Sequence, residues 1–358
     1  MKVLIGGGGT GGHLVPGIAL YKEFAKYNVE LLYVLSDRDK AYDIFELLKS
    51  DERIFVSLTG ISRRLSISTI KQLFSIFNAW RQVFKKIKQF NPDFMVITGG
   101  YLSNIVALSA LLMRKPLYIL EQNSVAGITN RFWAHFAKNI FTTFPSPKFI
   151  PPHKEIYTGN PLLYKELLSL EESCALLELS SSTKPIIGIS GGSQGSQIIN
   201  NLVLKIIPFL IEKGYQIVWS LGTKEYERFD KENLLSSLDP YLENIKIYRF
   251  ITRMDAFWSA SRLVLARSGA GTVSESLLFR TPSLFIPIFQ SPDNHQYLNA
   301  KFLKDQSCAE ILEEPTLTEQ KLLETIIMMM SNQEYYHNNF FIREEDPAST
   351  IVSFLLLQ

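Results

Sequence analysis

Cysteine is scarce in this 358-residue sequence, which contains only Cys174 and Cys308. The two lie far apart, in neither a CxxC pattern nor a mixed Cys/His spacing, so a disulfide framework and a cysteine-based zinc site are excluded. No stretch approaches the roughly 18 apolar residues of a membrane-spanning helix. The N-terminus also lacks the basic segment, apolar segment and cleavage site of a signal peptide. We therefore expect a protein of the reducing cytosol that is soluble or at most peripheral to a membrane.

Acidic residues are absent from residues 54–92, which carry seven basic ones. This segment lies in a basic part of the chain, because residues 1–150 have 19 Lys and Arg against 10 Asp and Glu, a net of +9. Residues 151–358 have 18 against 25, a net of −7. The asymmetry indicates that the two halves have different roles, and the acid-free segment is typical of a surface that meets an anionic partner.

The remaining composition, 46% hydrophobic and 20% charged residues, is that of a globular protein with one large or two ordinary domains. Short apolar runs typical of strands alternate with longer helical patterns, and a linker rich in proline and glycine at 145–161 interrupts them. The sequence therefore predicts an α/β protein of two doubly wound, Rossmann-like domains. The ten expected strands are residues 3–5, 30–35, 94–98, 117–120, 140–143, 186–190, 216–220, 245–248, 263–266 and 283–286.

Three glycine-rich loops follow expected strands. The first, residues 6–13, matches the dinucleotide pattern G-x-G-x-x-G, and Asp37 lies where an NAD-binding acid would be, which keeps an oxidoreductase open. The others are residues 98–101 and 191–195. Each could form only a tight turn, or its backbone N–H groups could approach an anion at a helix N-terminus. Because one dinucleotide does not need three such loops, they favour two phosphorylated ligands.

Eight segments form a more specific pattern than any one loop: GGGGTGGH (6–13), IFNAWRQ (76–82), GGYLS (99–103), EQNSVAGITN (121–130), TGNP (158–161), GGSQGS (191–196), RSGAGTVSE (267–275) and DNHQYLNA (293–300). Together they resemble the MurG family of peptidoglycan glycosyltransferases over most of the chain. The resemblance implies a GT-B fold, in which a deep cleft separates two Rossmann-like domains. It also implies an inverting hexosyltransferase that moves GlcNAc from UDP-GlcNAc to the 4-hydroxyl of undecaprenyl-diphospho-MurNAc-pentapeptide (lipid I to lipid II).

The resemblance implies a different binding role for each domain. Residues 1–158, with a C-terminal helix at about 347–358, are expected to bind the acceptor and a membrane, and residues 162–345 are expected to bind UDP-GlcNAc. The implied partners are UDP-GlcNAc, the polyprenyl-diphosphate-linked acceptor, an anionic membrane surface and other cell-wall synthesis proteins, with no nucleic acid. The implied location is peripheral, at the cytoplasmic face of the cell membrane.

Three sites depart from the family pattern. Asn104 and Ile105 stand where Gly-Pro is usual, Leu120 where His is common, and Leu163 where Arg is usual. We therefore expect the acceptor contacts to differ from the family's near Asn104, and we assign no binding role to Leu163.

Donor contacts are implied mainly in the second domain. Glu275 would accept hydrogen bonds from both ribose hydroxyls, Ser193 would bind a phosphate, and Gln296 would hold GlcNAc hydroxyls. Ile251 would offer backbone groups to uracil. The simpler alternatives are that Glu275 is an exposed helix acid and Ser193 a helix cap. Gln296 could instead belong to a solvated helix face, and Ile251 could be a core side chain. The full expected donor set is Thr10, Gly11, Gly12, Asn123, Ser193, Gln194, Ile251, Ala270, Gly271, Glu275 and Gln296.

Acceptor contacts are implied in the first domain, where two glycine loops would hold the acceptor diphosphate through Gly8, Gly9, Gly99, Gly100 and Tyr101. Their alternative role is only to form tight strand-to-helix turns.

Three residues are candidates for the base that takes the proton from the acceptor hydroxyl. His13 comes first because imidazole titrates near neutral pH, although it could instead form a neutral hydrogen bond or pack in the structure. Asp37 and Glu121 are the others, each with a salt bridge or a cap as its alternative. Asp37-Arg-Asp39 reads as a metal-binding Asp-x-Asp, but it lacks a sugar-nucleotide context. We therefore expect no cofactor and no obligatory metal.

An amphipathic helix is expected within residues 67–88, where apolar residues recur at helical spacing with basic residues between them. We expect Phe84 and Ile87 in the core. The alternative is that the whole apolar side packs on its own domain. The expected membrane surface consists of Ile70, Lys71, Phe74 and Phe77.

Two other enzyme classes fit parts of the sequence. A sugar-nucleotide 2-epimerase would share the two-domain architecture, but it would have no use for a lipid-facing basic segment. An NAD-dependent oxidoreductase would not account for the loops at 191–196 and 268–275 together.

Overall fold

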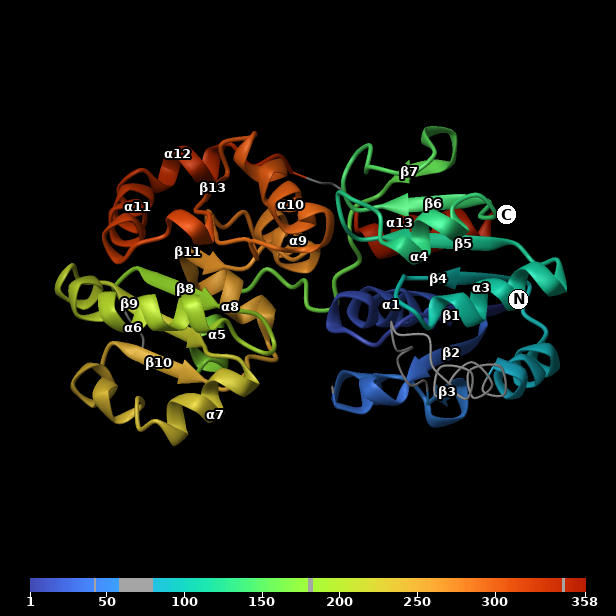
Figure 1. The fold of residues 1–358 in the computed structure, drawn as a ribbon, viewed down its shortest axis with the longest axis horizontal. Helices are drawn as coiled ribbons and strands as arrows, with labels where there is room; N and C mark the ends of the chain where they lie inside the picture. Colours follow the sequence, from blue (N-terminus) through green and yellow to red (C-terminus); the bar gives the residue numbers. More distant parts are fainter. Residues whose placement is uncertain (42, 58–79, 180–182, 343–344) are drawn as a thin grey trace, which may run out of the picture. The chain divides into compact units, whose positions relative to one another are not determined.

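The computed structural model describes residues 1–41, 43–57, 80–179, 183–342 and 345–358. The chain forms two compact units, Met1–Leu163 together with Glu344–Gln358, and Tyr164–Arg343. Each unit is built on one parallel β-sheet with helices around it, as Figure 1 shows. This is the α/β architecture that the sequence predicted.

The first unit has a seven-stranded sheet in the order β3-β2-β1-β4-β5-β6-β7. Its strands are β1 (Lys2–Gly6), β2 (Glu30–Ser36), β3 (Arg53–Val56), β4 (Phe94–Ile97), β5 (Leu117–Glu121), β6 (Asn139–Thr142) and β7 (Glu155–Tyr157). Strands β2 and β4 flank β1, and Gly6 at its end lies opposite Val34 and Ile97. The loops after β1 and β4 therefore meet at the point where the strand order reverses, which is where ligands bind in sheets of this kind.

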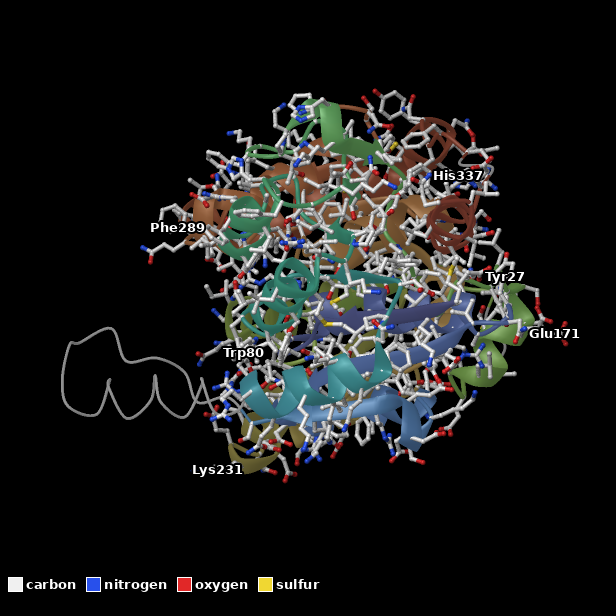
Figure 2. The ribbon with its side chains drawn as sticks, turned by 90° about the vertical axis from the view of Figure 1, so that its right-hand side faces the viewer. Tyr27, Trp80, Glu171, Lys231, Phe289 and His337 are labelled. Atoms are coloured by element: carbon white, nitrogen blue, oxygen red, sulfur yellow. The ribbon has the colours of Figure 1, made fainter. Side chains whose placement is uncertain are left out.

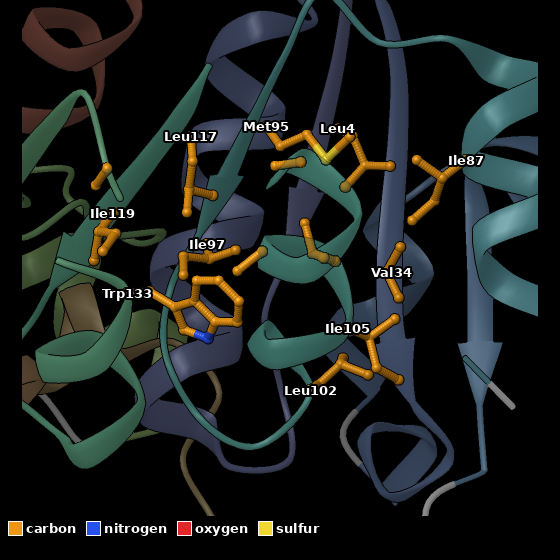
Figure 3. Close-up of a cluster of buried hydrophobic side chains, with 14 of the residues drawn as sticks. Leu4, Val34, Ile87, Met95, Ile97, Leu102, Ile105, Leu117, Ile119 and Trp133 are labelled. Carbon is orange, nitrogen blue, oxygen red and sulfur yellow. The ribbon is translucent and has the colours of Figure 1, made fainter. Parts of the chain in front are cut away.

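Helices pack on both faces of this sheet because its strands are apolar on both sides. They are α1 (Gly11–Phe24), residues 80–90, α3 (Ser103–Met113), α4 (Ile128–Trp133) and α13 (Pro347–Leu356), with short 3-10 turns η1 (Asp37–Ala41), η2 (Asp43–Leu47), η3 (Ser50–Glu52) and η4 (Pro152–Lys154). One face buries Leu4, Ile97 and Trp133 together, as Figure 3 shows. The other buries Ile351 of α13 beside α1. The C-terminal helix thus returns to the first unit, as expected.

The second unit has a six-stranded sheet in the order β10-β9-β8-β11-β12-β13. Its strands are β8 (Ile186–Ser190), β9 (Gln216–Ser220), β10 (Ile245–Tyr248), β11 (Ser261–Ala266), β12 (Ser283–Phe285) and β13 (Ala309–Ile311). Its helices are α5 (Leu170–Leu176), α6 (Gln197–Glu212), α7 (Thr223–Lys231), α8 (Met254–Ala260), α9 (Ala270–Phe279), α10 (His295–Lys304), α11 (Glu319–Ser331) and α12 (Gln333–Asn338), with 3-10 turns η5 (Ser236–Tyr241), η6 (Pro292–Asn294) and η7 (Glu314–Thr316). The loops after β8 and β11 meet at the equivalent switch point, because these two strands are neighbours.

All ten expected strands are present. Three further strands, β3, β7 and β13, were not predicted. Each is only three or four residues long and lies at a sheet edge. Strand β7 lies inside the stretch predicted as a linker, and it pairs with β6 of the first unit. The prolines around it interrupt the helical pattern without ending the domain.

The helix at 80–90 tests part of the amphipathic prediction. Ile87 is buried in the core, as expected. Phe84, also expected in the core, is only half-buried and stacks on Trp80 at 5.1 Å between ring centroids. Trp80 opens the described part of this helix (Figure 2). No helix in the described part of the chain is long and apolar enough to cross a membrane. Four positions lie outside the described residues: Ile70, Lys71, Phe74 and Phe77.

Candidate active site

The glycine loop at 191–196 connects β8 to α6 in the second unit. Ser196, rather than Ser193, caps the helix by accepting a hydrogen bond from the Ile199 N–H at 3.4 Å. The Ser193 hydroxyl and the N–H groups of Ser193 and Gln194 have no hydrogen-bond partner among the described residues. The capping alternative for Ser193 is therefore wrong, and this loop keeps unpaired donors.

Arg267 lies behind the same loop and was not predicted as a functional residue. Its guanidinium donates to Ser196 Oγ at 2.7 Å and to the Ile286 carbonyl at 2.9 Å. It also pairs with Glu314 at 2.6 Å. The side chain is largely buried, so it fixes the loop at 191–196 against the end of β11. In the sequence, only its position at the start of the RSGAGTVSE segment could have indicated a functional role for Arg267.

The N-terminus of α9 follows β11 and has no side-chain cap and no acid in its first turn. The N–H groups of Ala270, Gly271 and Thr272 have no partner in the described part of the chain. The hydroxyl of Ser268 beside them is buried and likewise unpaired there. A helix N-terminus with free N–H groups attracts negative charge, so this segment has the properties of a phosphate site.

Glu275 lies on the same helix and is half-buried. The buried indole of Trp258 donates to its Oε2 at 3.0 Å. Burial raises the pKa of Glu275 to about 7, and the hydrogen bond from Trp258 opposes this shift. Its Oε1 has no hydrogen-bond partner among the residues described. Glu275 is therefore not an ordinary exposed helix acid, and Trp258 is a supporting residue that sequence reasoning missed.

Ile251 and Gln296 complete the set expected in this unit. The Ile251 side chain is buried in the apolar cluster with Trp258, as its alternative role required. Its backbone N–H and C=O have no partner among the described residues. The Gln296 side-chain carbonyl accepts from the Ile288 N–H at 3.1 Å, which directs the two N–H bonds of the amide away from that loop.

The glycine loop of the first unit, between β1 and α1, has a different environment. Asp39 is fully buried beneath it and accepts hydrogen bonds from the Gly9 N–H at 2.6 Å and the Ser36 N–H at 2.8 Å. Burial raises the pKa of Asp39, and the two N–H groups and nearby His13 oppose that shift. A Cβ atom at Gly8 would collide with the Asp39 carboxylate. The Gly9 amide is therefore not available to a diphosphate, contrary to the sequence prediction.

The second loop of this unit is shaped around a histidine ring. Gly99 and Gly100 have φ values of +99° and +77°, and a Cβ atom at Gly99 would lie 2.8 Å from Cε1 of His13. The Gly99 N–H already donates to Ser103 Oγ at 3.1 Å. Gly99 is thus needed for backbone conformation and for space beside His13, and its amide is not free for an anion. Tyr101 is partly exposed, and its hydroxyl lies 2.7 Å from Ser36 Oγ.

His13 lies in the first turn of α1. Its carbonyl accepts from Thr98 Oγ1 at 2.8 Å, and its Nδ1 lies 3.2 Å from Oε1 of Gln122. Thr10 precedes the helix without capping it, and the N–H groups of Gly11 and Gly12 have no partner in the described part of the chain. Here too the helix N-terminus retains free donors.

The two candidate carboxylate bases are already engaged. Glu121 is buried and accepts from the N–H groups of Asn123 at 2.9 Å and Gly127 at 3.1 Å, and from the Asn130 amide at 2.8 Å. It therefore organises the 121–130 loop. Asp37 pairs with Lys40 at 2.6 Å, which lowers the pKa of Asp37. A saturated carboxylate and one with a lowered pKa are both poor proton acceptors at neutral pH.

The departures from the family pattern have structural counterparts. Asn104 accepts from the Trp133 indole at 2.8 Å and donates to the Tyr101 carbonyl at 3.0 Å. Leu120 is fully buried in the sheet, and Leu163 packs against the same apolar cluster. Within the described ranges, no three His, Cys, Asp or Glu residues are arranged to hold a metal ion.

Both units match known domains. Residues 3–142 match the N-terminal domain of glycosyltransferase family 28, and residues 186–344 match the C-terminal domain of that family. Two curated relatives are named UDP-N-acetylglucosamine--N-acetylmuramyl-(pentapeptide) pyrophosphoryl-undecaprenol N-acetylglucosamine transferase. The one from Natranaerobius thermophilus is 34% identical over 91% of this chain and 90% of its own length. The one from Bacillus subtilis is 32% identical over the same shares.

Solved structures show the same fold. MurG of Acinetobacter baumannii superposes with a TM-score of 0.74 at 22% identity, covering 100% of this chain and 99% of its own. UDP-GlcNAc 2-epimerase from Methanocaldococcus jannaschii reaches a TM-score of 0.68 at 15% identity, covering 100% of both chains. At these identities the superpositions establish the GT-B fold alone, since transferase and epimerase share it.

Proposed function

The chain belongs to the MurG family of N-acetylglucosaminyltransferases, and on that premise we propose which of its residues bind the two substrates and which one moves the proton. The enzyme transfers GlcNAc from UDP-GlcNAc to undecaprenyl-diphospho-MurNAc-pentapeptide, the lipid I to lipid II step of peptidoglycan synthesis. The second unit binds the donor, and the first binds the acceptor.

The segment 268–275 carries the donor assignment. Among the described residues, it combines the unpaired amides and one unpaired oxygen of Glu275 on α9 with the unpaired Ser268 hydroxyl just before the helix. Glu275 accepts hydrogen bonds from the ribose diol, because a carboxylate offers two acceptor oxygens. The amides of Ala270 and Gly271, with the Ser193 loop, bind the diphosphate and stabilise it as it departs.

Two further contacts orient the donor. Ile251 binds the uracil edge through its backbone N–H and C=O, while its buried side chain fixes their position. Gln296 donates from its side-chain amide to hydroxyls of GlcNAc, because its carbonyl is already held by Ile288. We also propose that Thr10, Gly11, Gly12 and Asn123 bind the donor.

In the first unit the arrangement favours proton transfer. His13 is the base, because Asp37 and Glu121 are engaged elsewhere. The muramoyl 4-hydroxyl attacks the anomeric carbon on the face opposite UDP, so the reaction inverts configuration through an oxocarbenium-like state. Its proton passes to His13. Gly100 and the exposed Tyr101 contact the acceptor, whereas Gly8 and Gly9 shape the loop.

The acceptor is lipid-linked, so the first unit must reach a membrane. The described helix at 80–90 exposes Arg81, Lys85, Lys86 and Lys88, and no acid lies between 54 and 92. Anionic lipid attracts each nearby Lys or Arg by about 1 kcal/mol. These charges support peripheral binding at the cytoplasmic face of the membrane.

A transfer assay tests the function. With UDP-GlcNAc and a synthetic polyprenyl-diphospho-MurNAc-pentapeptide, one UDP should be released for each disaccharide formed, in EDTA as well as in buffer. With UDP-GlcNAc alone, no ManNAc epimer should appear. Epimer formation from the donor alone would assign the chain to the other enzyme class that has this fold. Complete loss in EDTA with recovery in Mn²⁺ would contradict a metal-independent reaction.

A further inference from the structure

Gln122 joins β5 to His13 by two hydrogen bonds. The residue is 2% exposed and directly follows the strand. Its Nε2 donates to the Leu120 carbonyl at 3.2 Å, and its Oε1 lies 3.2 Å from Nδ1 of His13. A backbone carbonyl can only accept, so it selects the NH₂ end of the amide. The oxygen end is therefore the one that faces the imidazole.

We propose that Gln122 is a positioning residue that keeps the proton of neutral His13 on Nδ1, so that Nε2 is the atom that accepts a proton. The proposal rests on the role of His13 as base. An acceptor facing one ring nitrogen fixes the tautomer, because that nitrogen must carry the hydrogen.

The ring has little freedom to adopt another arrangement. Gly99 and Gly100 lie against it, and Thr98 holds the His13 backbone carbonyl. Among the titratable groups on the elements packed here, Asp39 interacts with His13 through its charge, whereas Glu121 is hydrogen-bonded to its own loop.

The bonds formed and broken, and the proton transferred, can be accounted for with these groups alone. The 4-hydroxyl oxygen bonds to the anomeric carbon, the bond from that carbon to the UDP oxygen breaks, and the hydroxyl proton moves to His13 Nε2. Nδ1–H continues to donate to Gln122 throughout. A neutral acceptor suits this step, because a carboxylate in its place would stabilise the imidazolium and reduce the fraction of neutral His13 at a given pH.

The tautomer can be observed by ¹⁵N NMR of the imidazoles in the full chain. The protein has five histidines, so the His13→Gln variant identifies the His13 signals by their loss. We expect a protonated Nδ1 and an unprotonated Nε2 in the wild type, and a mixture of tautomers in Gln122→Met. Gln306→Met, which alters a glutamine of the second unit, is the matched control and should change nothing at His13. A proton on Nε2 in the wild type overturns the proposal.

Kinetic measurements give a second test, which a purely structural role of Gln122 would leave unchanged. Gln122→Met should lower kcat about five- to tenfold with UDP affinity unchanged. Gln122→Glu should shift the acidic limb of the kcat/KM profile upward by roughly one pH unit, because a carboxylate stabilises imidazolium. An unshifted limb in Gln122→Glu contradicts the proposal. If His13→Gln retains more than a fifth of kcat, the base assignment fails instead, and the NMR result still decides the tautomer.

Discussion

The glycine loops after β1 and β8 occupy equivalent places in the two sheets, but their backbone N–H groups are engaged differently. In the first unit the buried Asp39 carboxylate accepts the Gly9 N–H. In the second, the Arg267 guanidinium holds Ser196, and the amides of Ser193 and Gln194 stay unpaired within the described residues. Loop amides can hold an anion only if they are not already donating to another group. Two loops that look alike in sequence therefore suit different chemistry.

The largest expected effect is at the first of these loops. His13→Ala should lower kcat by about 10²- to 10⁴-fold, the usual cost of losing a general base. UDP affinity should survive, because the donor residues Glu275 and Ser193 belong to the other unit. Steady-state kinetics and calorimetry measure the two effects separately. A fall in kcat of less than about fivefold at neutral pH would remove His13 from the reaction.

In the second unit, the expected effect is on donor binding. Glu275→Ala should raise the KM for UDP-GlcNAc and lower kcat/KM roughly 10- to 150-fold, because charged hydrogen bonds are each worth about 1.5–3 kcal/mol. Calorimetry with UDP is the direct measurement. Unchanged UDP affinity would place the ribose elsewhere.

Donor binding should also depend on pH through Glu275. Burial raises the pKa of this carboxyl to about 7, and the ribose diol needs its ionised form. UDP affinity should therefore rise as pH increases through 7, with release of a proton on binding. The terminal phosphate of UDP titrates nearby, at about pH 6, so Glu275→Gln is the matched control. An identical pH dependence in wild type and variant would contradict an ionised Glu275 in the complex.

A smaller effect concerns the charge difference between the units. Reversal of two exposed lysines of the helix at 80–90, Lys85→Glu with Lys86→Glu, should weaken binding to anionic vesicles at least about tenfold at low salt. The same reversal at exposed Lys213 and Lys224 of the second unit is the control and should have little effect. Sedimentation with vesicles at two salt concentrations measures both. Equal pelleting of the two variants would show that this helix does not face the membrane.

The smallest effect on rate is expected at Glu121. Glu121→Gln removes the charge that holds three N–H groups, so the free energy of unfolding should fall by about 1–3 kcal/mol. The kcat of the folded fraction should change little, because the residue organises a loop. Urea denaturation and kinetics separate the two outcomes. Unchanged stability with a large loss of kcat would restore Glu121 as the base.

The sequence predicted the fold because the ten main strands are continuous apolar runs followed by turns. It did not predict the edge strands β3, β7 and β13, each of which includes a charged residue within three or four positions. Within the site, the sequence predicted the segments but not the hydrogen bonds that their residues form. Asp39 meets Gly9 across 30 residues and Gln122 meets His13 across 109, so no local spacing records either contact. Nor does a sequence reveal whether a carboxylate such as Glu121 is already saturated.

The central claim is that the loop amides of the second unit, and not the Gly9 amide, hold the donor diphosphate. A ¹⁵N TROSY titration of the full chain with UDP tests it amide by amide. The largest shifts should fall on Ser193, Gln194, Ala270 and Gly271, while Gly9 stays bonded to Asp39 and moves little. A shift at Gly9 as large as that at Ser193 or Gly271 would contradict the account.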